Sequence, residues 1–204
     1  MDKLFSMEGN LLNKMEKIAD MVLLNVLWII CCIPILTAGS ATTALYSVML
    51  KMVKDEESYI VRSFFYAFKE NFKQSTIIWM LFLGALGLIS VDFYFWNLKI
   101  GMGKIIIIPF AIILFLAVIT LQYTSPILAF FENSTSKVLK NAFLMATSYI
   151  PYTILILAVN LSPWILLLFS NLMISSFWNL VIGFSLSAWI NAHIFRKIFE
   201  KHRG

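Results

Sequence analysis

Five apolar stretches, each about as long as a membrane-spanning helix, constrain this chain more than any other feature. They cover residues 18–36, 77–96, 105–131, 143–169 and 172–195. About 20 helical residues are needed to cross ~30 Å of hydrocarbon. Charged residues make up 13% of the chain, against about 25% in soluble proteins. We therefore expect an all-α, polytopic helical membrane protein that forms a single integral membrane domain over residues 1–204.

A turn at Pro34 interrupts the end of the first apolar stretch. Proline disfavours helix at the residue before it, Gly39 can adopt positive φ, and Ser40 can cap a new helix. These signals predict a short broken helical hairpin over residues 18–53, preceded by a cytoplasmic N-terminal segment, residues 1–17. The chain leads directly from that segment into the first span, so we expect no cleaved signal peptide.

Small residues follow the turn at helical spacing. Ser40 and Ala44 lie four residues apart, a pattern that lets helix backbones approach closely in lipid. The simpler interpretation is packing between the first two helices. The alternative is that the start of the second helix, from Thr37 to Ser40, forms a site for an anionic or polar group, as discontinuous helices do in transporters.

The distribution of basic residues separates two topologies. With five crossings, eleven of the 16 Lys and Arg residues lie on one side of the membrane and five on the other. If residues 40–53 return through the membrane, fourteen lie on one side and only Lys99 and Lys104 on the other. The positive-inside rule then favours six crossings with both termini cytoplasmic. Five crossings remain the alternative, because residues 40–53 supply only ~21 Å of helix.

An amphipathic segment, residues 54–76, lies between the second and third expected crossings. Its aromatic face repeats every four residues, at Ile60, Phe64, Phe68 and Phe72. This pattern predicts a cytoplasmic helix lying on the membrane surface. The same face could instead dock a partner protein. We expect four further spans within residues 77–195 and a basic tail over residues 196–204.

Several motifs occur along nearly the whole chain. They are Asn25, Trp28 and the runs PILTAGSATTALY (34–46), FKENFKQS (68–75), PILAFFEN (126–133) and KNA (140–142). The pattern resembles the YesL-like family of bacterial integral membrane proteins of unknown function. The resemblance implies a multi-pass protein of the bacterial cell membrane. Because genes of that family often lie near carbohydrate uptake systems, it also implies an accessory role there.

Ionisable residues inside the expected spans are the default functional candidates, since their desolvation is costly. Asp20 lies one turn after Lys17, which predicts an interfacial ion pair. Asp92 precedes a run of aromatic residues, so we expect it to be hydrated at headgroup depth. Alternatively, its carboxylate could accept the free backbone amides at the start of the second helix. His193 is expected at the cytoplasmic interface.

No enzyme template fits the sequence. The run GFSLS (183–187) lacks the final glycine of a nucleophile elbow, and His193 lies ~12 Å along the same helix. No set of residues has metal-ligand spacing, and no phosphate-binding loop occurs. We expect no enzyme activity, no metal and no cofactor. Basic residues flank the spans instead of forming one face, so the lipid bilayer is the expected partner, and nucleic acid is not.

Two functional classes remain open. The first is an accessory or regulatory membrane protein, acting through a carbohydrate uptake complex. The second is a small transporter or substrate-capturing subunit. Uncharged polar residues within the spans, such as Asn25, Gln122, Asn160 and Asn179, are expected to hydrogen-bond between helices. In the second class they would line a path for substrate.

The predicted orientation can be tested with single cysteines in a variant that lacks Cys31 and Cys32. We expect Gly101→Cys to react with an impermeant thiol reagent from outside the cell. Ser58→Cys should react only after lysis, because its flanking segment carries the basic excess. Labelling of Ser58→Cys in intact cells would support five crossings.

Overall fold

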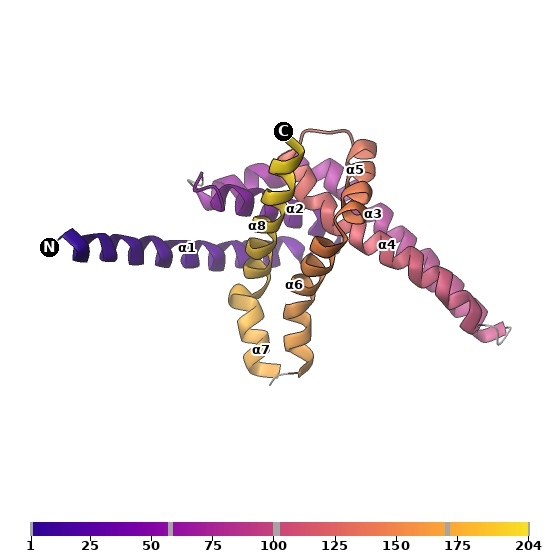
Figure 1. Ribbon diagram of the computed structural model, residues 1–204. Coiled ribbons are helices and arrows are strands. Elements are labelled where there is room, and N and C mark those ends of the chain that lie inside the picture. Colours follow the sequence, from indigo (N-terminus) through magenta and orange to yellow (C-terminus); the bar gives the residue numbers. More distant parts are fainter. Residues whose placement is uncertain (1, 57–58, 100–102, 170–171, 204) are drawn as a thin grey trace.

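The computed structural model describes residues 2–56, 59–99, 103–169 and 172–203, and the described chain is helical apart from short turns (Figure 1). The labelling positions Ser58 and Gly101 lie outside these residues. The all-α prediction is confirmed for the described part of the chain. The elements are α1 (Asp2–Cys32), the 3₁₀ turn η1 (Ile35–Thr37), α2 (Ala38–Met52), α3 (Ile60–Lys99), α4 (Gly103–Phe130), α5 (Thr135–Ser148), α6 (Ile150–Phe169), α7 (Leu172–Trp178), the π-helical turn η2 (Asn179–Gly183) and α8 (Phe184–Arg203).

Two long helical hairpins diverge from a common base (Figure 1). One hairpin pairs α3 with α4, and the other pairs α6 with the consecutive helices α7, η2 and α8. Within the described residues, four helical stretches are long and apolar enough to cross a membrane: Ile60–Asp92, Ile108–Phe130, Ile150–Leu168 and Met173–Lys201. These stretches support a multi-pass membrane protein. The number of crossings expected from the sequence, six, is not confirmed.

The hairpin of α1 and α2 turns back about halfway along its neighbours. Near the tip, the Trp28 ring lies 4.7 Å from the ring of Phe184. At the base, Arg196 Nη1 donates a hydrogen bond to the carbonyl of Val53, at 3.0 Å. Phe184 and Arg196 are separated by ~18 Å of helix, and the chain extends a further ~16 Å in the other direction to Met173. The tip therefore lies near the middle of the α7–η2–α8 path.

Thr37 closes the turn between α1 and α2. Its hydroxyl lies 2.6 Å from the carbonyl of Cys31 and 2.8 Å from that of Pro34. Thr37 is also the N-cap of α2, so the prediction that Ser40 caps this helix is wrong. The closest carbonyl to the Thr37 hydroxyl belongs to the end of α1, which explains why the chain reverses here despite the apolar character of the segment.

The small-residue face of α2 packs against α3. Ser40 Oγ donates to the carbonyl of Phe72 at 3.2 Å and lies 3.1 Å from Thr76 Oγ1. One turn further, Ser75 Oγ donates to Thr43 Oγ1 at 3.0 Å. The prediction that these small residues allow close helix packing is therefore confirmed, but the helix that faces Ser40 is α3. Ala44, on the same helix, is fully buried.

Most of the amphipathic segment and the second apolar stretch, residues 77–96, form one uninterrupted helix, α3. No proline or glycine occurs between Ile60 and Gly84 to break it. This corrects the prediction of a separate interfacial helix. Ile60 and Phe64 are buried in the core and Phe68 packs against it, whereas Phe72 is 41% exposed. The predicted interfacial or partner face is thus largely covered by the protein itself.

Gly39 provides the clearest test of the α2–α3 contact. A Cβ atom at this position would lie 2.7 Å from Trp79 Cβ and 2.9 Å from the carbonyl oxygen of Ser75. Because backbone must move to relieve that overlap, Gly39→Ala should destabilise the protein by ~1–3 kcal/mol, measured as thermal unfolding in detergent. Ala44→Leu should act in the same direction.

Gly84 supplies a matched control for this substitution. It also lies within a helix, but no atom lies within 4 Å of a Cβ built there. Gly84→Ala should therefore be neutral or stabilise the protein by about 0.5–1 kcal/mol, through the lower backbone entropy of the unfolded chain. If Gly39→Ala unfolds at the same temperature as Gly84→Ala, the close approach of α2 and α3 is not needed for stability.

Candidate binding cavity

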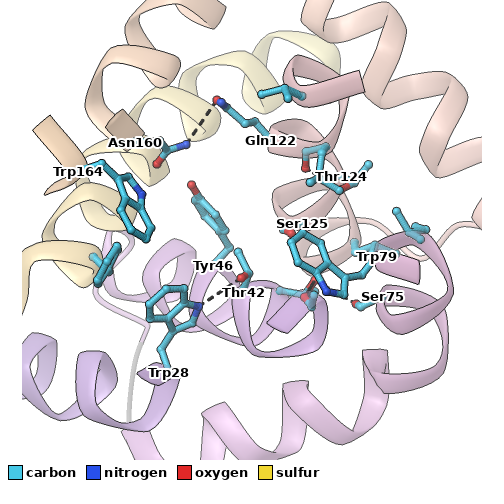
Figure 2. Close-up of a pocket in the computed structure, with 17 residues that line it drawn as sticks. Trp28, Thr42, Tyr46, Ser75, Trp79, Gln122, Thr124, Ser125, Asn160 and Trp164 are labelled. Atoms are coloured by element: carbon cyan, nitrogen blue, oxygen red, sulfur yellow. Dashed lines mark hydrogen bonds between the residues drawn. The ribbon is translucent and has the colours of Figure 1, made fainter. Parts of the chain in front are cut away.

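A cavity of about 290 Å³ lies beside the tip of the α1–α2 hairpin, between the two long hairpins (Figure 2). Residues from α1, α2, α3, α4, α6 and α8 line it. Trp28 and Trp164 stand on one side, and Trp79 and Ser125 stand opposite. None of the lining residues is Asp, Glu, Lys, Arg or His. The cavity therefore combines indole rings with uncharged polar groups.

An uncharged hydrogen-bond network joins four helices at one end of this cavity. Asn191 Nδ2 donates to Asn160 Oδ1 at 2.7 Å and lies 3.4 Å from Tyr46 Oη. Asn160 Nδ2 in turn lies 3.4 Å from Gln122 Oε1. Figure 2 shows the Tyr46 ring pointing toward Asn160 and Gln122. Because these side chains come from α2, α4, α6 and α8, the network fixes the cavity wall at the point where the helices converge.

Two of the indole rings are anchored by the hairpin turn. Trp28 Nε1 donates to Thr42 Oγ1 at 3.2 Å, and the Thr42 hydroxyl donates to the carbonyl of Ala38 at 2.8 Å. Trp79 Nε1 donates to the carbonyl of Ile35 at 2.7 Å. Both N–H groups are thus used within the protein, so these indoles can offer a ligand only ring surface.

Three other lining side chains keep polar groups available. Within the described part of the chain, no partner is found for Ser125 Oγ, for Gln122 Nε2 or for the indole N–H of Trp164. Pro126 also lacks the N–H that would otherwise bond the backbone carbonyl of Gln122. In α6, by contrast, the carbonyl that Pro163 leaves free accepts a hydrogen bond from Ser162 Oγ at 2.7 Å. The α4 wall therefore keeps unused hydrogen-bonding capacity, to which α6 adds the indole N–H of Trp164.

Asn25 holds α1 against the π-helical turn η2. This side chain is fully buried. Its Nδ2 donates to the carbonyls of Asn179, at 2.9 Å, and Leu180, at 2.7 Å, while its Oδ1 accepts the backbone N–H of Ser185 at 2.9 Å. Asn179 Nδ2 then donates to the carbonyl of Pro163 in α6, at 2.9 Å. The prediction that Asn25 and Asn179 bond between helices is confirmed.

The basic end of the fold is tied together by charged groups outside the spans. Lys17 forms a salt bridge and a hydrogen bond with Asp55, in the turn after α2. This hydrogen bond holds the pKa of the Asp55 carboxyl below its usual value. Lys54 Nζ lies 5.0 Å from the centre of the Phe130 ring at the end of α4. The middle of α1, the turn after α2 and the end of α4 therefore meet on the basic side.

The other residues singled out in the sequence lie away from the cavity. Asp92 is exposed, and ~20 Å of α3 separates it from Trp79, which contacts the hairpin tip. The alternative that its carboxylate accepts the amides at the start of α2 is therefore wrong. His193 is exposed, with Nδ1 3.0 Å from the carbonyl of Trp189. Pro34 is exposed at the turn, and of the predicted hairpin motif only Gly39 lines the cavity.

Sequence reasoning missed the tryptophans of the cavity and the link through Asn191. One signal was available: Trp28, Trp79 and Trp164 stand within apolar stretches, where tryptophan is less usual than at the membrane interface. The described residues contain no group of three or more His, Cys, Asp or Glu side chains that could hold a metal ion.

Comparison with known proteins gives one match. Residues 21–93 match the family model described as "Protein of unknown function, DUF624". This region contains most of the α1–α2 hairpin and the part of α3 that lines the cavity. The match is consistent with the resemblance to a YesL-like family of unknown function. No curated protein and no solved structure matches the chain.

Replacing Asn25 tests how strongly η2 depends on α1. Asn25→Ala leaves two backbone carbonyls and one N–H without their side-chain partner in a buried site, at a cost of ~1–3 kcal/mol for an unpaired group. We expect a clear fall in the thermal unfolding temperature in detergent. Asn71→Ala serves as a control, because Asn71 is half-buried and, among the described residues, its side chain bonds only to the carbonyl of Ala67 in its own helix. Similar unfolding temperatures for the two variants would contradict the proposed role of Asn25.

Proposed function

We propose that this chain is a small membrane component that captures a polar solute in the cavity at the hairpin tip, as a transporter or as the substrate-capturing subunit of an uptake system. The observation that carries the proposal is the composition of the cavity wall. Hydroxyls, amides and indoles gathered between membrane helices are costly to leave without partners. Here half-buried Ser125 and Gln122 and the 56% exposed Trp164 keep polar groups available to a ligand. A purely structural helix bundle has no need for unused donors around a 290 Å³ space.

We also propose a topology in the bacterial cell membrane. The four span-length stretches cross the bilayer, and the α1–α2 hairpin enters halfway and returns to the same, cytoplasmic, side. Irregular backbone at membrane depth is tolerated where protein buries it or where it lines a cavity. This topology keeps the fourteen-to-two division of basic residues, because both ends of the hairpin stay on the basic side. It also removes the need for 15-residue α2 to span the bilayer.

The arrangement of the long hairpins supports entry from the other side. The α3–α4 and α6–α8 hairpins diverge away from their common base (Figure 1). Basic side chains lie at that base, among them Arg196, which bonds the carbonyl of Val53, and Lys54, beside Phe130. The cavity lies beside the tip of the α1–α2 hairpin and has walls from both long hairpins. We infer that the solute reaches the cavity from the side opposite the cytoplasm, in the direction of uptake.

A blocked cavity tests the proposal. Ser125→Phe places a ring in the cavity, whereas Ser90→Phe makes the same change at an exposed position of α3. In a strain without the gene, uptake of at least one labelled sugar, polyol or amino acid should fall. Wild-type protein and Ser90→Phe should restore it, and Ser125→Phe should not, at equal protein level in the membrane. Restoration by Ser125→Phe would contradict solute capture. Transport by purified protein in liposomes would identify a transporter acting alone.

A second candidate function is an accessory or regulatory role in a carbohydrate uptake complex. The observation that favours it is a set of exposed aromatic side chains, Tyr59 just before α3 and Phe65, Tyr66 and Phe72 in its first half. These side chains, and not the buried Phe64, are available to a partner protein. Co-purification of an ATPase or permease, combined with full activity of Ser125→Phe, would favour this role over solute capture.

A further inference from the structure

The cavity wall offers nothing to balance an ionic charge. Its lining residues are apolar, aromatic or uncharged polar. Transfer of an ion from water into such a site is costly unless a counter-charge or a full set of hydrogen bonds replaces its hydration. An uncharged solute carries no such cost, so the wall selects against ions before any specific contact is considered.

The unused polar groups point to a ligand with several hydrogen-bonding groups. Gln122 Nε2 and Trp164 Nε1 are donors, while Ser125 Oγ can donate and accept. Figure 2 shows Gln122 and Ser125 on the α4 side of the cavity, with Trp164 across from them. A solute between them therefore meets hydrogen-bonding groups together with indole ring surface, which Trp28 supplies on one side of the cavity and Trp79 on the other.

We propose that the cavity binds an uncharged solute that has several hydroxyl or amide groups and one apolar face, through Gln122, Ser125 and Trp164. This inference rests on the proposed function and names the chemical class of its solute. A volume of about 290 Å³ matches a small molecule, since it falls close to the lower end of the common range of ligand sites, about 300–1,000 Å³.

The charge preference can be measured without knowing the natural solute. Cys31 and Cys32 are the only cysteines, so both are replaced by alanine and Ser125→Cys is introduced. The purified protein in detergent is then treated with three methanethiosulfonates of similar size: neutral hydroxyethyl, cationic ammonioethyl and anionic sulfonatoethyl. Ser134→Cys is the matched control, because Ser134 is exposed and its side chain makes no capping hydrogen bond.

The rate of each reagent with Ser125→Cys is divided by the rate of the same reagent with Ser134→Cys. On this scale the neutral reagent should modify Ser125→Cys at least about tenfold faster than either charged reagent. Adding Gln122→Glu should reverse this order in favour of the cationic reagent, because it places a carboxylate in the cavity wall. Equal rates for the three reagents would overturn the proposed solute class while leaving solute capture intact. No reaction with any of them would overturn both.

A second measurement tests the class with matched solutes. Three solutes are each added before the neutral reagent: myo-inositol, glucosamine and glucuronate. At neutral pH they are uncharged, cationic and anionic, respectively. Myo-inositol should slow modification of Ser125→Cys and leave Ser134→Cys unaffected. Protection by glucosamine or glucuronate, but not by myo-inositol, would overturn the inference that the solute is uncharged.

Discussion

The hydrogen bonds of one buried side chain, Asn25, are the interaction on which the rest of this structure depends. A π-helical turn shifts the backbone pairing of η2 and leaves polar groups that water cannot reach inside a membrane protein. Asn25 supplies a donor to two carbonyls and an acceptor to one N–H of this turn. It thereby fixes α1 against η2 and α8, and Asn179 extends the connection to α6. An apolar residue of the same size could fill the space but could not satisfy those groups.

The position of α1 in turn decides what the hairpin can present to the cavity. With α1 held at η2, the ring of Trp28 lies against Phe184, and the turn at Thr37 sends α2 back along α3. The close approach at Gly39 then brings Thr42 and the Tyr46 ring to the cavity. The cavity is therefore not a packing defect between two helices. It is the meeting point of side chains from both ends of the chain.

The sequence predicted the class of fold well, because apolar length and charge placement report directly on the membrane. The turn at Pro34 and the interhelical role of Asn25 could also be predicted from residue chemistry. Hydropathy could not show that the hairpin turns back about halfway along its neighbours, since apolar character does not report where a helix ends relative to the helices that it contacts. The four-residue period identified the apolar stripe that includes Phe64. It could not identify what that stripe contacts, which is the protein's own core. The alternative that Asp92 accepts the amides at the start of α2 failed for a related reason: α3 continues far beyond the hairpin tip.

The distance in sequence between Asn25 and its partners has a consequence for how the chain is made. The carbonyl that Asn25 Nδ2 bonds in Asn179 is 154 residues further along the chain, and the N–H of Ser185 is 160 residues further. Synthesis proceeds from the N-terminus, so α1 is made long before the groups that satisfy its amide exist. Until η2 is made, the Asn25 side chain lacks these three partners. The N-terminal hairpin is thus the first part to be synthesised and among the last to reach its native contacts.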